Sequence, residues 1–356
     1  MVSKSKPKVS VIVPTYNRAH VIDRAIRSVL NQTYQDFELI IVDGASTDNT
    51  EEVVKIFNDV RIRYIRQEIN KGTQAGRNIG IKAAKGEYIA FQDSDDEWLP
   101  EKLEKQMKVF QQLSPKVGMV YTDMIRINRN GKFFIYEAPT IMPDDGFVYQ
   151  KALNYYIGNI GIQTAVIRRT CFETVGLLDE RLPAFDDLEL FIRLSKYYYF
   201  YHIDEPLVKY YATEGSFGSN KRSWVAARKM ILEKYFDDIK KDKKVLANHY
   251  FQIAINLCNI KEFEEGLNYF YKIFEIDPNI RENRKLLSEY CYHIGVSLYS
   301  NDDLKNGRCY LLKAAYKNPL NIKYVLVAFI ALLCKNLYNI TMKIYQRIKP
   351  PERYWS

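Results

Sequence analysis

Residues 87–96 have the sequence EYIAFQDSDD, in which a short apolar run typical of a buried strand ends in three carboxylates. Asp93 and Asp95 stand two positions apart where the chain is expected to leave the strand, so both can turn toward one ligand. Carboxylate oxygens suit Mg²⁺ or Mn²⁺, which usually keep substrate phosphates and waters in their other positions. The alternative is a solvated acidic turn, with Asp96 or Glu97 near the start of a helix.

On both sides of this turn, apolar runs alternate with segments of helical periodicity. Strands are predicted at residues 9–13, 37–42, 62–65 and 87–92, and helices at residues 21–30, 50–58, 74–85 and about 100–113. Gly86 is expected to close the third helix. Four strand–helix units predict a mostly parallel, right-handed, Rossmann-like α/β sheet.

Ligands of such sheets bind beyond the carboxyl ends of the strands, and three polar clusters are predicted there. They are residues 14–18 (PTYNR), 43–48 (DGASTD) and 93–96 (DSDD). Turn chemistry alone is one explanation, since Asn, Asp, Gly and Ser all favour turns. The convergence of all three favours a binding site. No GxGxxG follows the first strand and no GxxxxGK[ST] occurs, so neither a dinucleotide site nor a P-loop is expected.

Composition limits the partners and the compartment. The 356 residues include 52 Lys and Arg against 43 Asp and Glu, a net charge of +9 that favours anionic partners. No helix-turn-helix, zinc-finger or RNP pattern is present, so nucleic acid is not an expected partner. The five cysteines form no CxxC pair, which is typical of buried thiols in a reducing cytosol. With no signal peptide or long apolar segment recognised, a cytoplasmic protein is expected.

From about Trp224 onward the pattern is helical and repeats. Seven positions recur at one spacing of 41 residues, from Ala254, Leu257, Phe263, Gly266, Phe270, Ile273 and Pro278 to Gly295, Leu298, Leu304, Gly307, Leu311, Ala314 and Pro319. The intervals match the register of tetratricopeptide repeats, which are about 34 residues long, with extra residues between units. Two generic amphipathic hairpins are the alternative.

Four segments are therefore expected. They are an α/β domain at residues 1–220, a helical connection at 221–246, two tetratricopeptide-like hairpins at 247–320, and a basic amphipathic helix at 321–356. The last holds six basic residues against Glu352: Lys323, Lys335, Lys343, Arg347, Lys349 and Arg353. Such a helix can make peripheral contact with the inner face of an anionic membrane, cap the repeat stack, or mediate self-association.

Collinear motifs now suggest a family. Residues 9–18 (VSVIVPTYNR), 40–50 (IIVDGASTDNT), 70–80 (NKGTQAGRNIG), 93–96 (DSDD), 175–180 (VGLLDE) and 186–194 (DDLELFIRL) resemble the nucleotide-sugar glycosyltransferases of family 2. The resemblance covers about residues 8 to 215. It implies a GT-A fold, and transfer of a sugar from a nucleotide donor, expected to be UDP, to a hydroxyl of a glycan or lipid-linked acceptor. The implied setting is the synthesis of surface polysaccharide or glycoconjugate.

The resemblance also implies residue roles. The donor would be bound by Pro14, Thr15, Tyr16, Asn17, Asp43, Arg77 and Asp93. Of these, Asp43 would accept a hydrogen bond from the base N–H, and Arg77 would contact the ribose or pyrophosphate. Asp95, with Asp93 in its environment, would hold a divalent metal ion. Asp187 would be the base for the acceptor hydroxyl, and the like charge of Asp186 would raise its pKa. Capping of a helix at residues 188–195 is the alternative for this acidic pair.

The chain departs from the family at one place. Several relatives carry Arg and then His after the acidic helix, where this chain has Tyr211 and Thr213, with Lys209 or Glu214 as candidate substitutes. His202 and His249 lack metal-ligand spacing. A single base with no evident carboxylate nucleophile predicts inversion of the sugar linkage. The rivals are a nucleotidyltransferase, which needs a glycine-rich basic loop after the first strand, and a helical-repeat interaction protein with an inactive α/β domain.

Overall fold

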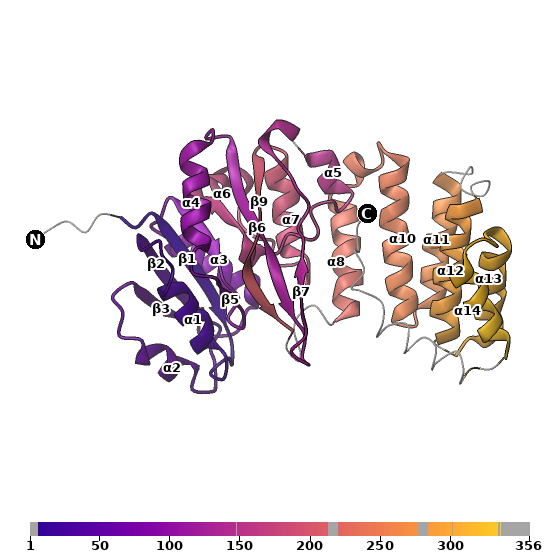
Figure 1. Ribbon diagram of the computed structural model, residues 1–356, viewed down its shortest axis with the longest axis horizontal. Helices are drawn as coiled ribbons and strands as arrows, with labels where there is room; N and C mark the ends of the chain where they lie inside the picture. Colours follow the sequence, from indigo (N-terminus) through magenta and orange to yellow (C-terminus); the bar gives the residue numbers. More distant parts are fainter. Residues whose placement is uncertain are drawn as a thin grey trace, which may run out of the picture. The chain divides into compact units, whose positions relative to one another are not determined.

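The computed structural model describes residues 6–146, 148–212, 220–276, 284–300, 302–333 and 335. Its contacts divide the chain into two units, Met1–Phe217 and Gly218–Ser356 (Figure 1). The predicted division of the second part into residues 221–246, 247–320 and 321–356 stays a prediction.

The first half of the sheet is parallel. Strands β1 (Val9–Thr15), β2 (Phe37–Asp43), β3 (Ile62–Arg66) and β4 (Tyr88–Phe91) run in the order β3-β2-β1-β4. Their connections contain α1 (Ile22–Leu30), α2 (Thr50–Ile56) and α3 (Thr73–Ala83), and α4 (Lys102–Gln112) comes after β4. The strand order reverses between β1 and β4, and ligands of doubly wound sheets bind at the carboxyl ends of strands at such a point.

The second half of the sheet is mixed. Strand β6 (Val117–Ile127) pairs parallel with β9 (Tyr199–Tyr211), and antiparallel with β7 (Phe133–Tyr136) and β8 (Val166–Arg168). Strand β8 also joins β4, and β5 (Glu97–Trp98) pairs with β9, so nine strands of the described residues form one sheet. Shorter elements complete the unit: η1 (Pro143–Asp145), α5 (Tyr149–Leu153), η2 (Ile162–Thr164), α6 (Arg169–Val175) and α7 (Asp186–Ser195). The predicted α/β sheet is present, with its parallel strands in the first half and mixed pairing in the second.

Helices cover both faces of the parallel strands. On one face, β1 and β4 form a buried core with Ile26 of α1 and Met107 of α4. On the other, Phe91 contacts Phe172 of α6, and α3 lies so close that a Cβ on Gly80 would be 2.4 Å from Ile12 Cγ2. Burial on both faces explains why β1 and β2 are continuous apolar runs. The polar residues Thr15 and Asp43 stand at the carboxyl ends of these two strands.

All eight helices and strands predicted around the carboxylate turn are present, with small differences at their ends. Helix α3 ends at Ala83, so Gly86 does not close it, and that detail of the prediction is wrong. A Cβ on Gly86 would lie 2.6 Å from the Ser10 backbone nitrogen, so the glycine is required for close approach to β1. Glu97 lies in β5 and not near a helix start.

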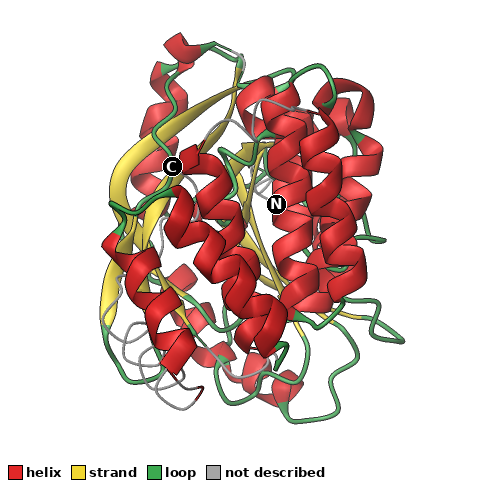
Figure 2. Cartoon of the chain, turned by 90° about the vertical axis from the view of Figure 1, so that its right-hand side faces the viewer, coloured by secondary structure: helices red, strands yellow, loops and turns green. Residues whose placement is uncertain are grey.

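The second unit is helical. Its helices are α8 (Lys221–Lys234), α9 (Phe236–Ile239), α10 (Lys243–Asn259), α11 (Phe263–Ile276), α12 (Arg284–Ser300), α13 (Leu304–Lys317) and α14 (Ile322–Leu333). Figure 2 shows its long helices lying side by side. Gly266 and Gly307 lie at close contacts: a Cβ would be 2.7 Å from Cys258 Sγ and 2.6 Å from the Tyr299 nitrogen, respectively. Assignment to the tetratricopeptide class stays a prediction.

Candidate active site

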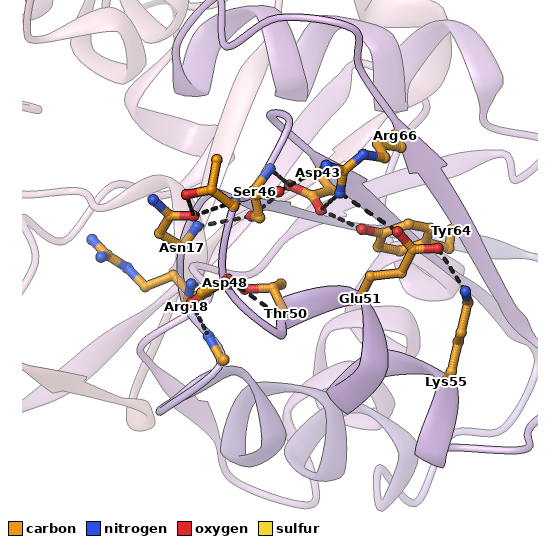
Figure 3. Close-up of polar contacts among 12 residues, drawn as sticks. Asn17, Arg18, Asp43, Ser46, Asp48, Thr50, Glu51, Lys55, Tyr64 and Arg66 are labelled. Atoms are coloured by element: carbon orange, nitrogen blue, oxygen red, sulfur yellow. Dashed lines mark hydrogen bonds and ion pairs between the residues drawn. The ribbon is translucent and has the colours of Figure 1, made fainter.

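The loops after β1 and β2 are joined by hydrogen bonds (Figure 3). The Asn17 N–H donates to Ser46 Oγ at 2.8 Å, and the Thr47 N–H donates to Asn17 Oδ1 at 2.8 Å. The Gly44 N–H donates to Thr15 O at 2.8 Å. Asn17 has a φ of 52°, a left-handed conformation in which asparagine is enriched. Two of the polar clusters predicted from the sequence therefore form one connected structure.

Asp48 fixes the start of α2 to the β1 loop. Its Oδ1 accepts from the Thr50 N–H at 3.1 Å and the Thr50 hydroxyl at 2.5 Å, and its Oδ2 accepts from the Ala19 N–H at 3.1 Å. Burial opposes ionisation, but the hydrogen bonds from Thr50 and Ala19 lower the pKa of Asp48 below its usual value. Turn chemistry thus accounts for this part of the second cluster.

Asp43 ends β2 with a fully buried carboxylate. Its Oδ1 accepts from the Ser46 N–H at 2.9 Å and hydroxyl at 2.6 Å, while its Oδ2 accepts from the Tyr64 hydroxyl and from Arg66 Nη1 at 3.3 Å. Burial, and then the hydrogen bond to Asp43, raise the pKa of Tyr64, so this hydroxyl stays a donor. A base N–H would have to join or replace these donors for Asp43 to bind it as predicted.

Residues 14–17 lie beside Asp43 at the end of β1. Thr15 and Asp43 are opposite each other in the strand register. The Thr15 hydroxyl is buried and has no hydrogen-bond partner in the described part of the chain. Pro14 is buried within β1, whereas the Tyr16 ring is exposed. The structure therefore brings these predicted donor-binding residues together.

The carboxylate turn follows β4. The Asp96 N–H donates to Asp93 O at 3.1 Å, and the Tyr211 N–H donates to Asp96 Oδ1 at 3.1 Å. Asp93 and Asp95 are partly exposed, whereas Asp96 is fully buried. Burial, and then the charges of Asp93 and Asp95, raise the pKa of Asp96 well above its usual value. The solvated-turn alternative is therefore wrong for Asp96.

Arg24 of α1 joins this turn to the end of β9. Its Nη2 donates to Asp95 O, and its guanidinium carbon lies 3.7 Å from the centroid of the Tyr211 ring. The Tyr211 hydroxyl donates to Glu97 Oε2 at 2.8 Å. No role was predicted for Arg24, because its contacts come from segments that are distant in the sequence and no local pattern distinguishes it.

The carboxylate turn offers two partly exposed carboxylates, Asp93 and Asp95, to a divalent cation. Among the described residues no three His, Cys, Asp or Glu side chains gather as a metal site. Asp93 and Asp95 nevertheless fit a cation that takes one or two carboxylates from the protein and its other ligands from phosphates and water. The concentrated negative charge that raises the pKa of Asp96 is what such a cation would neutralise.

Arg77 of α3 is buried between two carboxylates. Its Nη2 donates to Asp93 Oδ1 and its Nη1 to Asp186 Oδ2, both at 2.8 Å. Only 8% of the side chain is exposed. Burial opposes its charge, yet Asp93, Asp186 and Asp187 raise the pKa of Arg77. Both terminal nitrogens are thus used by carboxylates, and a contact with ribose or pyrophosphate stays a prediction.

Gln74 and Asn78 share the α3 face of Arg77, because residues three and four apart are neighbours on a helix. Gln74 Nε2 donates to Leu182 O at 3.0 Å. Asn78 Nδ2 donates to Leu178 O, and the Leu178 N–H donates to Asn78 Oδ1, both at 3.0 Å. This polar stripe holds the segment that leads into α7. No role was predicted for Gln74 and Asn78, although their helical spacing indicated that they share one face of a helix.

Asp187 lies in the first turn of α7, beside Asp186. Its Oδ1 accepts from the Leu188 N–H at 2.7 Å. Burial raises the pKa of Asp187 to about 7, with the charge of Asp186 adding to the shift and that of Arg77 opposing it. Helix α7 begins at Asp186 and its N-cap is Phe185, without a side-chain capping bond, so the capping alternative predicted for the acidic pair is wrong. A pKa near 7 is suited to a base.

The other residues considered as ligands or substitutes either have different partners or lie outside the described residues. Lys209 Nζ is paired with Glu97 at 2.8 Å. Thr213 and Glu214 lie outside the described residues. His202 Nε2 is 2.8 Å from Asp123 Oδ1 in the buried core. His249 is buried in α10 of the second unit.

Comparison with known proteins identifies the family of the chain. The family model described as "Glycosyl transferase family 2" matches residues 10–176. TuaG of Bacillus subtilis (strain 168), a putative teichuronic acid biosynthesis glycosyltransferase, is 34% identical over 228 residues, which are 63% of this chain and 86% of TuaG. The chain belongs to glycosyltransferase family 2.

Two other matches extend the comparison of this glycosyltransferase. The Escherichia coli protein WfgD, named UDP-Glc:alpha-D-GlcNAc-diphosphoundecaprenol beta-1,3-glucosyltransferase, is 39% identical over 162 residues, which are 46% of this chain and 60% of WfgD. The crystal structure of S. aureus TarS 1-349 in complex with UDP-GlcNAc has a TM-score of 0.52 at 17% identity, covering 97% of this chain and 93% of that one. The structural match confirms the predicted GT-A fold.

Replacing Arg77 tests the central ion pairs of the enzyme. Arg77→Met would leave the carboxylates of Asp93 and Asp186 without their cation, and breaking a buried ion pair costs about 3–5 kcal/mol. Chemical denaturation should show a loss of that order in the free energy of unfolding. Arg181→Met, which removes an exposed partner of Asp179, is the matched control and should change it little. Equal losses in both variants would contradict the argument.

Proposed function

We propose that this glycosyltransferase moves a sugar from a nucleotide donor, expected to be UDP-linked, to a hydroxyl of a glycan or lipid-linked acceptor, with inversion. The observation that carries the proposal is the bridge made by Arg77. It joins the carboxylate turn on the donor side, through Asp93, to the acidic pair that contains the proposed base, through Asp186. One network therefore links the groups needed by both substrates.

On the donor side, we assign the base to the edge formed by residues 14–17 and Asp43, and the ribose to Asp93. The Thr15 hydroxyl, buried without a partner in the described part of the chain, and the exposed Tyr16 ring supply a polar edge and a flat face. A divalent cation held by Asp95, with Asp93 nearby, would stabilise the charge that develops on the diphosphate as it leaves.

On the acceptor side, Asp187 removes the proton. Its carboxylate takes the hydrogen of the acceptor hydroxyl while that oxygen bonds to the anomeric carbon. The bond from that carbon to the diphosphate oxygen breaks at the same time, and the nucleoside diphosphate departs with the electron pair. Attack opposite the leaving group inverts the linkage. Asp93 and Asp186 are both bound to Arg77, so neither is assigned the part of a nucleophile.

The acceptor class rests on the relatives. TuaG and the E. coli K12 protein WcaA are named for teichuronic acid and colanic acid biosynthesis, and the name of WfgD gives a diphosphoundecaprenol acceptor. Synthesis of a surface polysaccharide or glycoconjugate fits these names. Metal-dependent hydrolysis in a screen of nucleotide-sugars tests the donor class, and its absence with every donor would favour a domain without transfer activity. Release of pyrophosphate would indicate a nucleotidyltransferase instead.

Asp95→Asn tests the metal. Loss of the charged ligand should lower turnover at least about 10²-fold, as expected for removal of a principal electrostatic stabiliser. Steady-state transfer with and without added Mn²⁺ measures the effect. Full activity of the unaltered enzyme in EDTA would refute metal dependence.

Asp187→Asn separates chemistry from binding. The substitution should abolish transfer and leave UDP affinity nearly unchanged, because the base contacts only the acceptor. Asp43→Ala should instead weaken nucleotide binding, since it removes the carboxylate at the end of β2. Isothermal titration with UDP and an assay of transfer compare the two variants. Equal weakening of UDP binding in both would show that the roles are wrongly divided.

The pH profile tests the pKa of Asp187. The base must be ionised, and its raised pKa of about 7 means that protons occupy it below neutral pH. The value of kcat/KM should therefore fall about tenfold per pH unit below pH 7 and level off above it. UDP binding, measured over the same range, serves as the control. An acidic limb with its midpoint near 4, the ordinary value for Asp, would contradict the raised pKa.

A further inference from the structure

Apart from Lys323 and Tyr324, helix α14 consists of apolar residues. Val327, Ala328 and Ala331 face a core shared with α12 and α13. Every exposed side chain described in this helix is also apolar: Ile322 at 79%, Val325 at 40%, Leu326 at 50%, Phe329 at 56% and Leu332 at 48% exposure. Their spacing of three and four residues places them on one stripe. A helix that is apolar on both its inner and its outer face is normally covered on both faces. The outer stripe of α14 is therefore expected to bind a partner.

The stripe belongs to a helix that is firmly anchored. The Tyr299 hydroxyl and Arg308 Nε both donate to Ala331 O at 2.9 Å. Lys335, just beyond the helix, forms an ion pair with Asp302. The inner face and the carboxyl end of α14 are thus fixed, and the exposure of the stripe is a property of the folded unit.

The surrounding sequence is strongly basic. From Leu304 to the last residue the chain has ten basic residues, namely Lys305, Arg308, Lys313, Lys317, Lys323, Lys335, Lys343, Arg347, Lys349 and Arg353. Glu352 is the one acidic residue of that stretch. The same stretch holds further exposed apolar side chains at Leu312, Tyr316 and Leu320. Apolar surface together with one sign of charge is the pattern of elements that lie in the headgroup region of anionic bilayers.

Two other occupants fit less well. A second copy of the chain would bring the same positive charge against itself. A further helix from this chain has a sequence obstacle, because the spacing that relates α11 to α13 would start it near residue 345. Pro350 and Pro351 would then fall inside it, where proline breaks a helix.

We propose that the outer stripe of α14, with the basic residues of α13 and α14, docks the enzyme on an anionic lipid surface. The contact is peripheral: within the described residues no helix has the length and apolar character needed to cross a bilayer. The apolar side chains would enter the headgroup boundary, and the lysines and arginines would meet the lipid phosphates. The inference is independent of the proposed sugar transfer, since binding needs no substrate.

Vesicle flotation of the full-length enzyme, without nucleotide or acceptor, tests the surface. At low salt, mixed phosphatidylcholine and phosphatidylglycerol vesicles should bind at least about tenfold more enzyme than phosphatidylcholine alone, because each basic residue near an anionic surface strengthens partition about fivefold. Added salt should reduce the binding. Equal binding to the two vesicles, or no binding to either, would overturn the proposal.

Matched variants locate the contact. Leu326→Ser with Phe329→Ser should lower vesicle binding at least about fivefold, whereas Val60→Ser with Ile69→Ser, exposed apolar positions of the first unit, should not. Neutralising Lys305, Lys313 and Lys317 to Gln should weaken binding more than the same change at Lys240, Lys241 and Lys243, which are exposed elsewhere in this unit. Unchanged binding by the Leu326 and Phe329 variant would refute the assignment. So would a dimer, seen by light scattering, that this variant abolishes.

Discussion

The buried guanidinium of Arg77 is the constraint on which the arrangement of the site depends. Its two hydrogen bonds require that the turn carrying Asp93 and the helix start carrying Asp186 stay on opposite sides of one side chain. A buried charge that lost a partner would be costly, so the three segments are held together by a shared need for neutralisation. The polar stripe of α3 supports them, because Gln74 and Asn78 bind the chain between the turn and α7.

The same network sets the chemistry of Asp187. Burial and the neighbouring Asp186 raise its pKa, and Arg77 limits the rise. Because the pKa of Asp187 is higher in the folded than in the unfolded chain, its contribution to stability is present below about pH 4 and is lost as pH rises through about 7. The ionised form that a base requires is therefore the form that the fold disfavours. This opposition between stability and ionisation is common at functional sites.

The sequence predicted the features that depend on residues close together in the chain. The apolar runs of β1 and β2 and the helical periodicity of α1 follow from local pattern, and the carboxylate turn follows from residues 93–96. The mixed half of the sheet was not predicted, since strands of two and three residues, β5 and β8, are too short to show alternation. Likewise, the partners of Arg77 lie far from it in the chain, so no window around this residue could show that its charge is neutralised within the protein.

The described contacts of the proposed active site belong to the first unit. Every contact given above for the carboxylate turn, Arg77 and Asp187 comes from the unit Met1–Phe217. The described residues of the second unit have other features, namely long helices, an exposed apolar stripe and a basic excess. As proposed, such a surface would raise the local concentration of the enzyme wherever anionic lipid is present, which benefits a transferase only if its acceptor is held at the same surface.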